Sequence, residues 1–239
     1  MIGIFSKTLD SNIVESACLG GIDFIILDME HGPNNWSSIH NHTRAAKIIG
    51  TKSIVRVTDC NPSSIGLALD SGVDGVQVPN IISAKMAREA VSAARFSPLG
   101  SRGVCRFVKD AKFGQKKRDI YFKESNEKLL ILQVEGKDGI AQIDEILKVK
   151  GFDILFIGPY DLAQSLGISG QVEHPQIFAL CQKLVERAKK SGKTLGIFVD
   201  TFEQSQKYKS LGIEYIAYSV DMNIFREAVN SIVASFNSI

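Results

Sequence analysis

Short apolar runs recur along the whole chain, and each one is followed by a segment with helical spacing. The runs are almost continuously apolar and do not alternate between apolar and polar residues. They lie at 1–5, 24–28, 53–57, 75–79, 129–135, 152–159, 194–200 and 215–221. Continuous runs of this kind are typical of strands that are buried on both faces, as in a parallel sheet covered by helices. The pattern therefore predicts the α/β class.

The segments between the runs are amphipathic, as at 83–95 and 175–192. Eight strand–helix units use up the chain and leave no linker, so we expect residues 1–239 to form a single TIM-barrel domain. Residues 97–128 are too polar and irregular for the barrel wall. They follow the fourth predicted strand, at the end of a barrel where long loops commonly carry function.

Composition narrows the class of protein further. The 239 residues are 44% hydrophobic and carry a net charge of +2, and no basic stripe indicates a nucleic-acid partner. No stretch approaches the ~18 apolar residues of a membrane span, and the first residues do not resemble a signal peptide. Four widely spaced cysteines without a CxxC pair fit a reducing compartment. We therefore expect a cytoplasmic protein without a membrane or nucleic-acid partner.

Polar side chains close several of the predicted strands, at the rim where TIM barrels place their active sites. Among them, Glu135 and Asp161 follow neighbouring strands. Two carboxylates side by side repel each other unless a cation or a proton lies between them. Oxygen ligands suit Mg²⁺ or Mn²⁺, and Co²⁺ could substitute. The alternative is that Glu135 and Asp161 only cap the helices that follow.

Three further residues near this rim could move protons or bind an anion. Asp28 and His31 could form a carboxylate–imidazole pair in which the acid orients the ring; alternatively, His31 is an ordinary loop histidine. Arg56 lies in a buried strand and needs an anionic partner, which could be a structural carboxylate or a substrate oxygen.

The residues Gly158, Pro159, Tyr160 and Asp161 form a strand-to-helix turn whose N–H groups could bind a small carboxylate. No lysine fits the carboxyl end of a predicted strand, where a Schiff-base aldolase would need one. No glycine-rich dinucleotide or phosphate loop follows any strand either. The sequence therefore lacks the usual residues for Schiff-base chemistry, hydride transfer and phosphoryl transfer.

Six motifs occur in the order found in one known family. They are DMEHGP at 28–33, VRV at 55–57, GVDGVQVPNI at 72–81, SRGV at 101–104, QVE at 133–135 and IGPYDLAQSLG at 157–167. Together they resemble the HpcH/HpaI aldolase/citrate lyase family of pyruvate-binding TIM barrels. The resemblance implies a metal-dependent aldolase that joins pyruvate to an aldehyde, or cleaves the resulting 4-hydroxy-2-oxo acid, such as a 2-keto-3-deoxy sugar acid.

The same resemblance implies roles for individual residues. Glu135 and Asp161 would bind the metal, and Arg56 would stabilise the enolate oxygen. His31, oriented by Asp28, would take part in proton transfer.

Pyruvate itself would be bound beside the metal. Gln133 would contact it, and the N–H groups of Tyr160 and Asp161, in the turn that begins with Gly158 and Pro159, would bind its carboxylate.

The resemblance also implies a homo-oligomer, commonly a hexamer, in which residues 221–236 form a C-terminal helix exchanged between subunits. Two alternatives remain open. One is an acyl-CoA lyase of the citrate lyase β type, for which the basic segment 109–118 could bind a nucleotide. The other is a non-catalytic barrel that binds a keto acid.

Overall fold

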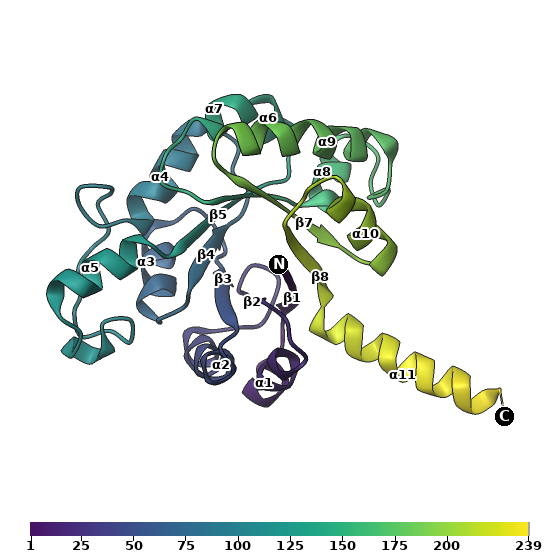
Figure 1. Cartoon of the computed structure of the whole chain (residues 1–239), viewed down its shortest axis with the longest axis horizontal. Coiled ribbons are helices and arrows are strands. Elements are labelled where there is room, and N and C mark those ends of the chain that lie inside the picture. The colour runs from purple at the N-terminus through teal and green to yellow at the C-terminus, as the bar shows by residue number, and fades with distance from the viewer. Residues whose placement is uncertain (239) are drawn as a thin grey trace.

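The computed structural model describes residues 1–238, in which parallel strands close into a barrel surrounded by helices (Figure 1). Each strand pairs with the next in sequence, and β8 pairs with β1. The strands are β1 (Ile2–Ser6), β2 (Phe24–Asp28), β3 (Lys52–Arg56), β4 (Gly75–Val78), β5 (Leu129–Val134), β6 (Ile154–Ile157), β7 (Thr194–Val199) and β8 (Tyr215–Val220). The predicted (β/α)₈ TIM barrel is confirmed, and each strand lies within three residues of its predicted bounds.

Helices follow the strands, and most of them cover the outside of the barrel. They are α1 (Ser11–Leu19), α2 (Trp36–Ile49), α3 (Pro62–Asp70), α4 (Ala84–Ala94), α5 (Arg118–Asn126), α6 (Lys137–Ala141), α7 (Ile143–Leu147), α8 (Pro159–Ser165), α9 (Pro175–Lys190), α10 (Phe202–Ser210) and α11 (Asp221–Asn237). Within residues 1–238, no helix combines the length and the apolar character needed to cross a membrane.

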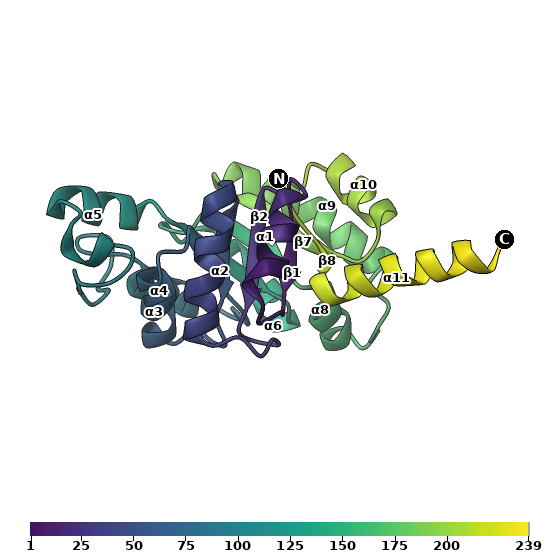
Figure 2. The same ribbon diagram turned by 90° about the horizontal axis from the view of Figure 1, so that it is seen from below.

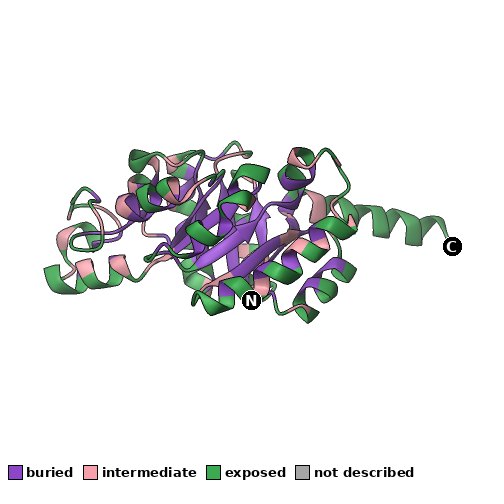
Figure 3. Ribbon diagram, turned by 90° about the horizontal axis from the view of Figure 1, so that it is seen from above, coloured by how far each residue is buried: buried purple, intermediate pink, exposed green. Residues whose placement is uncertain are grey.

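The strands bury both faces, and burial follows the two-residue period of a strand. Along β2, Phe24 and Ile26 belong to the cluster inside the barrel, whereas Ile25 and Leu27 pack outward against the helices. Figure 3 shows the strands as the buried centre of the molecule. This alternation determines which residues near the ends of the strands face the inside of the barrel.

Residues 97–128, predicted as a long loop, contain α5 and a short 3₁₀ turn (Lys112–Gly114). A small separate core forms here, in which Phe96, directly before the segment, packs against Tyr121. Lys128 Nζ lies 2.8 Å from Asp110 Oδ1, and Ser125 donates to the same carboxylate. The segment extends away from the barrel (Figures 1 and 2).

The C-terminal helix α11 also leaves the body of the molecule. It begins at the end of β8 and projects away from the barrel in both ribbon views (Figures 1 and 2). Its buried Asp221 accepts hydrogen bonds from Ser6 Oγ and from the main-chain N–H groups of Lys7 and Thr8. The helix is therefore attached at its first residue to the loop that follows β1.

Candidate functional site

A cavity of about 300 Å³ opens at the carboxyl ends of the strands. Residues from β1, β3, β5, β6, β7 and β8, and from the segments that follow β1, β2, β5 and β6, surround it. They are Phe5, Lys7, His31, Arg56, Gln133, Glu135, Phe156, Gly158, Pro159, Tyr160, Asp161, Phe198 and Val220. The structure thus brings together every predicted site residue except Asp28, which lies buried beside Arg56.

The strand period explains why polar side chains enter the barrel at this end. Ile54 lies in the interior cluster, and Arg56 is two residues further along β3. Ile131 and Gln133 have the same relation on β5. Side chains two residues apart point to the same face of a strand. The last inward positions therefore carry polar groups where the interior opens into the cavity.

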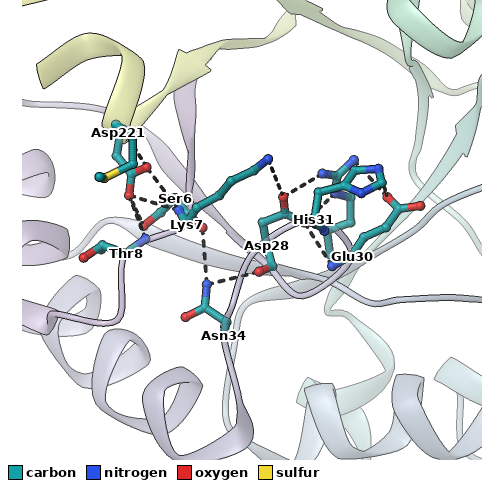
Figure 4. A network of polar contacts seen from close by, with 10 residues as sticks. Ser6, Lys7, Thr8, Asp28, Glu30, His31, Asn34 and Asp221 are labelled. Carbon is teal, nitrogen blue, oxygen red and sulfur yellow. Dashed lines mark hydrogen bonds and ion pairs between the residues drawn. The ribbon is translucent and has the colours of Figure 1, made fainter. Parts of the chain in front are cut away.

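Arg56 is the centre of an ion-pair network with Asp28 and Glu30, two of the residues labelled in Figure 4. Its Nε and Nη2 atoms donate to the two Asp28 oxygens at 2.9 and 2.7 Å, and its Nη1 lies 2.9 Å from Glu30 Oε2. Burial alone would raise the pKa of Asp28, but the bonds and charge of Arg56 outweigh burial and lower it. Asp28 is therefore the structural carboxylate partner that a buried arginine requires.

The expected contact between Asp28 and the His31 ring is not formed in the described chain. In the loop after β2, Asp28 Oδ1 accepts hydrogen bonds from the main-chain N–H groups of Glu30 and His31, not from the His31 ring. Arg56 binds both oxygens of the Asp28 carboxylate. The nearest carboxylate to the ring is that of Glu30, whose Oε2 lies 4.0 Å from His31 Nε2. The His31 side chain is 59% exposed and faces the cavity.

Glu135 is held by donors on both of its oxygens. The main-chain N–H of Asn80 donates to Oε1 at 2.8 Å, and the Gln133 amide donates to Oε2. Gln77 in turn donates to Gln133. Asn80 has a φ of 56°, a left-handed conformation that is tolerated where surrounding contacts enforce it.

The glycine at position 158 leaves room for this carboxylate. A Cβ atom there would lie 2.6 Å from Glu135 Oε2.

Burial and neighbouring carboxylates raise the pKa of two glutamates in this space, Glu135 and Glu30. Burial raises the pKa of Glu135 to about 7; the bonds from Gln133 and Asn80 oppose this, and the charges of Glu30 and Asp161 add to it. Burial also raises the pKa of Glu30 to about 7, with Arg56 opposing and Asp28 and Asp161 adding. The concentration of negative charge, formed by oxygen donors, suits a hard divalent cation.

Among residues 1–238, no three His, Cys, Asp or Glu side chains converge as a ready-made metal site. Glu135 and Asp161 can supply two oxygen ligands and leave the remaining coordination positions of a metal ion to oxygens of water or substrate. This donor set fits Mg²⁺ or Mn²⁺, which keep several positions for water and substrate.

The capping alternative is wrong for both residues. The N-cap of α6 is Gly136, and no side chain caps that helix. Helix α8 begins at Pro159 with Gly158 at the N-cap, so Asp161 lies in its first turn. The N–H groups in the first turn of a helix have no acceptor within the helix, so those of Tyr160 and Asp161 are available at the cavity.

Comparison with known proteins agrees with this geometry. The model of the HpcH/HpaI aldolase/citrate lyase family matches residues 1–228. This chain belongs to that family. The 2-keto-3-deoxy-L-rhamnonate aldolase of Salmonella gallinarum is 32% identical over 240 residues, which cover 100% of this chain and 89% of the relative. The predicted family and aldolase class are therefore confirmed.

Three solved structures that are similar to this chain have the same fold. A family protein from Burkholderia cenocepacia is 29% identical with a TM-score of 0.94, covering 99% of this chain and 94% of that one. An HpcH/HpaI aldolase from Desulfitobacterium hafniense is 28% identical with a TM-score of 0.92, covering 100% and 93%. A citrate synthase is 28% identical with a TM-score of 0.86, covering 99% and 93%.

Sequence reasoning missed several residues at this HpcH/HpaI site. Glu30 and Asn80 join the carboxylate network, and Asn80 Nδ2 donates to Glu30 at 3.2 Å. Lys7 lines the cavity directly after β1, so the expectation that no lysine lies at the carboxyl end of a strand is wrong. Phe5 on β1 faces the interior of the barrel, and side chains two residues apart point to the same face of a strand. This alternation could have identified Lys7 from the sequence.

The segment 97–128 differs from expectation. None of its residues, including the basic stretch 109–118, lines the cavity in the described chain. Within that stretch, Lys109 donates to the His40 carbonyl and Lys116 to Glu124. The observed site is therefore built from short loops after the strands, close to the barrel.

Proposed function

We propose that this protein is a divalent-metal-dependent aldolase that cleaves a 4-hydroxy-2-oxo acid reversibly into pyruvate and an aldehyde. The observation that carries the proposal is that Glu135 and Asp161 share one cavity with Arg56 and His31. Formation of an enolate requires a Lewis acid, a cationic neighbour and a proton acceptor near one another. The relative named 2-keto-3-deoxy-L-rhamnonate aldolase supports the substrate class.

Each residue has a role that follows from its surroundings. Glu135 and Asp161 would bind Mg²⁺, Mn²⁺ or Co²⁺, which supplies Lewis acidity to the keto acid. Arg56, held rigidly by Asp28, keeps its cationic group at the cavity wall, where it would stabilise the enolate oxygen. His31 is exposed enough to exchange protons with solvent and would carry protons to and from the reacting carbon.

Binding of pyruvate would use groups on β5 and α8. Gln133 would contact pyruvate, although its amide already bonds Gln77 and Glu135. The N–H groups of Tyr160 and Asp161 would bind the carboxylate, in the turn where Gly158 and Pro159 start α8. Asp28 would act through Arg56, in place of the predicted action through His31.

The deciding experiment follows exchange of the methyl protons of pyruvate in D₂O, because this step needs no aldehyde. We expect exchange to require added Mn²⁺ or Mg²⁺ and to stop with EDTA, and the same metal dependence for aldol turnover. Full activity in excess EDTA would overturn the metal mechanism. The acyl-CoA lyase alternative would instead show turnover only with a thioester, and a binding protein would show neither reaction.

Lys7 provides a matched test of the rival Schiff-base mechanism. Its Nζ lies 3.8 Å from Asp28 Oδ2 (Figure 4), whereas Schiff-base lysines are activated by an apolar pocket or another cation. We expect Lys7→Met to retain metal-dependent exchange and borohydride to trap no pyruvate on the protein. Trapping that is lost in Lys7→Met would contradict the proposal.

We also propose that α11 docks on a second copy of the chain. Its exposed apolar residues are Met222, Phe225, Val229, Ile232, Val233 and Phe236. Figure 3 shows the projecting helix largely exposed. Helices in proteins owe most of their stability to packing of an apolar face, and α11 leaves this face exposed.

A second copy offers matching apolar surface beside β8. Ile13 and Leu19 on α1 and Phe202 on α10, the helices on either side of β8 in the ring, are also exposed. We therefore infer a homo-oligomer with an exchanged C-terminal helix.

The oligomer has its own test, a mass measurement in solution. We expect Phe225→Asp combined with Ile232→Asp to lower the oligomer mass, because charge on the apolar stripe opposes docking. Asn230→Asp, an exposed change on the same helix, is the matched control and should leave the mass unchanged. A wild-type protein that is monomeric at all concentrations would contradict docking.

A further inference from the structure

The cavity wall divides into a polar part and an aromatic part. The polar part consists of Arg56 on β3, Gln133 on β5, Glu135 directly after β5 and Asp161 in the first turn of α8. The opposite part, from β7, β8 and β1, carries other residues. These are Phe198, Val220, Phe5 and the single cation Lys7. A role for this second part rests on the proposed function, which assigns pyruvate to the polar part and so leaves the aromatic part to the aldehyde.

The aromatic part is a series of rings in edge-to-face contact. The rings of Phe5 and Phe198 are 5.7 Å apart at 66°, and those of Phe198 and Tyr160 are 6.1 Å apart at 60°. Phe156 contacts Phe5 from inside the barrel, at 6.3 Å. Tyr160 is the outermost ring and is 47% exposed, so it lies where the cavity opens to solvent.

A single hydrogen bond holds the end of the Tyr160 side chain. Its hydroxyl donates to Asp200 Oδ2 at 2.8 Å. Burial, followed by the bond and charge of Asp200, raises the pKa of Tyr160 to about 12, so the hydroxyl remains a donor at neutral pH. Asp200 directly follows β7, and its own N–H donates to the buried Gln204 side chain at 2.8 Å. The acceptor of the bond is therefore fixed to the start of α10.

We propose that Asp200 is a positioning residue that holds Tyr160 beside the aromatic part of the cavity and thereby limits the size of the aldehyde. The enzyme accepts a short aldehyde with an apolar body and discriminates against a bulky one. Without this bond, the Tyr160 ring keeps only its edge contact with Phe198 and can turn toward solvent. The space it leaves lies next to Phe198, where the body of a longer aldehyde would bind.

The test compares wild type with Asp200→Ala, using pyruvate, Mn²⁺ and either propanal or phenylacetaldehyde. Wild type should prefer propanal. In Asp200→Ala, the ratio of kcat/KM for phenylacetaldehyde to that for propanal should rise about 10-fold, the low end of what a change in an apolar pocket produces. Asp200→Asn retains an oxygen that can accept the Tyr160 hydroxyl, so its ratio should remain that of wild type.

Two further variants separate this bond from general effects on the fold. Tyr160→Phe removes the same bond from the other side and should shift the ratio in the same direction. Glu203→Ala removes an exposed carboxylate from the first turn of α10, away from the cavity lining, and should not shift it. An unchanged ratio in Asp200→Ala, or an equal shift in Asp200→Asn, would overturn the inference.

Exchange of the pyruvate methyl protons in D₂O distinguishes failure of the inference from failure of the proposed function. It needs no aldehyde, so it should proceed at the wild-type rate in Asp200→Ala. If wild type shows no metal-dependent exchange, the proposed function fails. If exchange is normal and the aldehyde ratio does not move, only the role of Asp200 fails.

Discussion

The polar and the aromatic parts of the cavity are held in place by different kinds of interaction. In the polar part, Arg56 bonds both oxygens of Asp28, and donors from Gln133 and Asn80 engage both oxygens of Glu135. In the aromatic part, the rings touch edge to face and only Tyr160 is hydrogen-bonded. Directional bonds fix positions closely, whereas apolar packing tolerates exchange of side chains of similar volume.

This difference indicates that the two parts of the cavity have different functions. A buried charged network cannot lose one member without leaving another group unpaired, so substitutions there should damage the reaction itself. The aromatic wall can change shape at lower cost, so substitutions there should change which aldehyde reacts. Five substitutions test this division, beginning with the largest expected effect.

Glu135→Ala should have the largest effect, because it removes a carboxylate from the proposed metal site. We expect turnover to fall at least ~100-fold, equivalent to about 3 kcal/mol of transition-state stabilisation. Titration with Mn²⁺ should show weaker metal binding. A variant that binds Mn²⁺ as tightly as wild type would remove Glu135 from the metal site.

His31→Ala should slow turnover about 100-fold, which is the lower end of the effect of losing a general acid–base group. We expect the lower end because the ring is exposed and water can partly replace it. Unlike Glu135→Ala, it should still bind Mn²⁺ and pyruvate. Asp28→Asn provides the comparison. Because Asp28 contacts Arg56 and not the His31 ring, this variant should resemble an Arg56 variant. Near-normal turnover in His31→Ala would show that His31 is an ordinary loop histidine without a role in proton transfer.

Arg56→Lys keeps the charge but loses the forked donors that bind Asp28. We expect roughly 2 kcal/mol of transition-state stabilisation to be lost, or about 30-fold in turnover, the range for hydrogen bonds to charged groups. Circular dichroism should confirm that the barrel remains folded. Equal rates for the lysine variant and wild type would make Arg56 purely a structural ion-pair residue.

Phe198→Ala should have the smallest effect, and a selective one. Removing the central ring of the aromatic wall should raise KM for the aldehyde about 10-fold, as expected for lost apolar contact. The KM for pyruvate should change less. A larger rise in KM for pyruvate than for the aldehyde would contradict the division of the cavity into two parts.

Much of this protein could be predicted from its sequence, for physical reasons that are local. Continuous apolar runs identify strands buried on both faces, and parallel strands bring the polar residues at their carboxyl ends to one rim. Glu135, Asp161, Arg56 and His31 could therefore be assigned to one site from the order of the strands alone. The aromatic wall could not, because Phe5 and Phe198 look like ordinary strand residues in the sequence.

Only the tertiary structure determined which charged side chains pair with each other. Asp28 and His31 are three residues apart, yet Asp28 pairs with Arg56, 28 residues away, because adjacent strands place the guanidinium against both carboxylate oxygens. Lys7 and Glu30 enter the site in the same way, through the registration of neighbouring strands and the loops after them. Hydrophobic periodicity depends on neighbours along the chain, so the sequence determined the barrel. Partner choice among charged groups depends on distances across the sheet, which exist only after the barrel has closed.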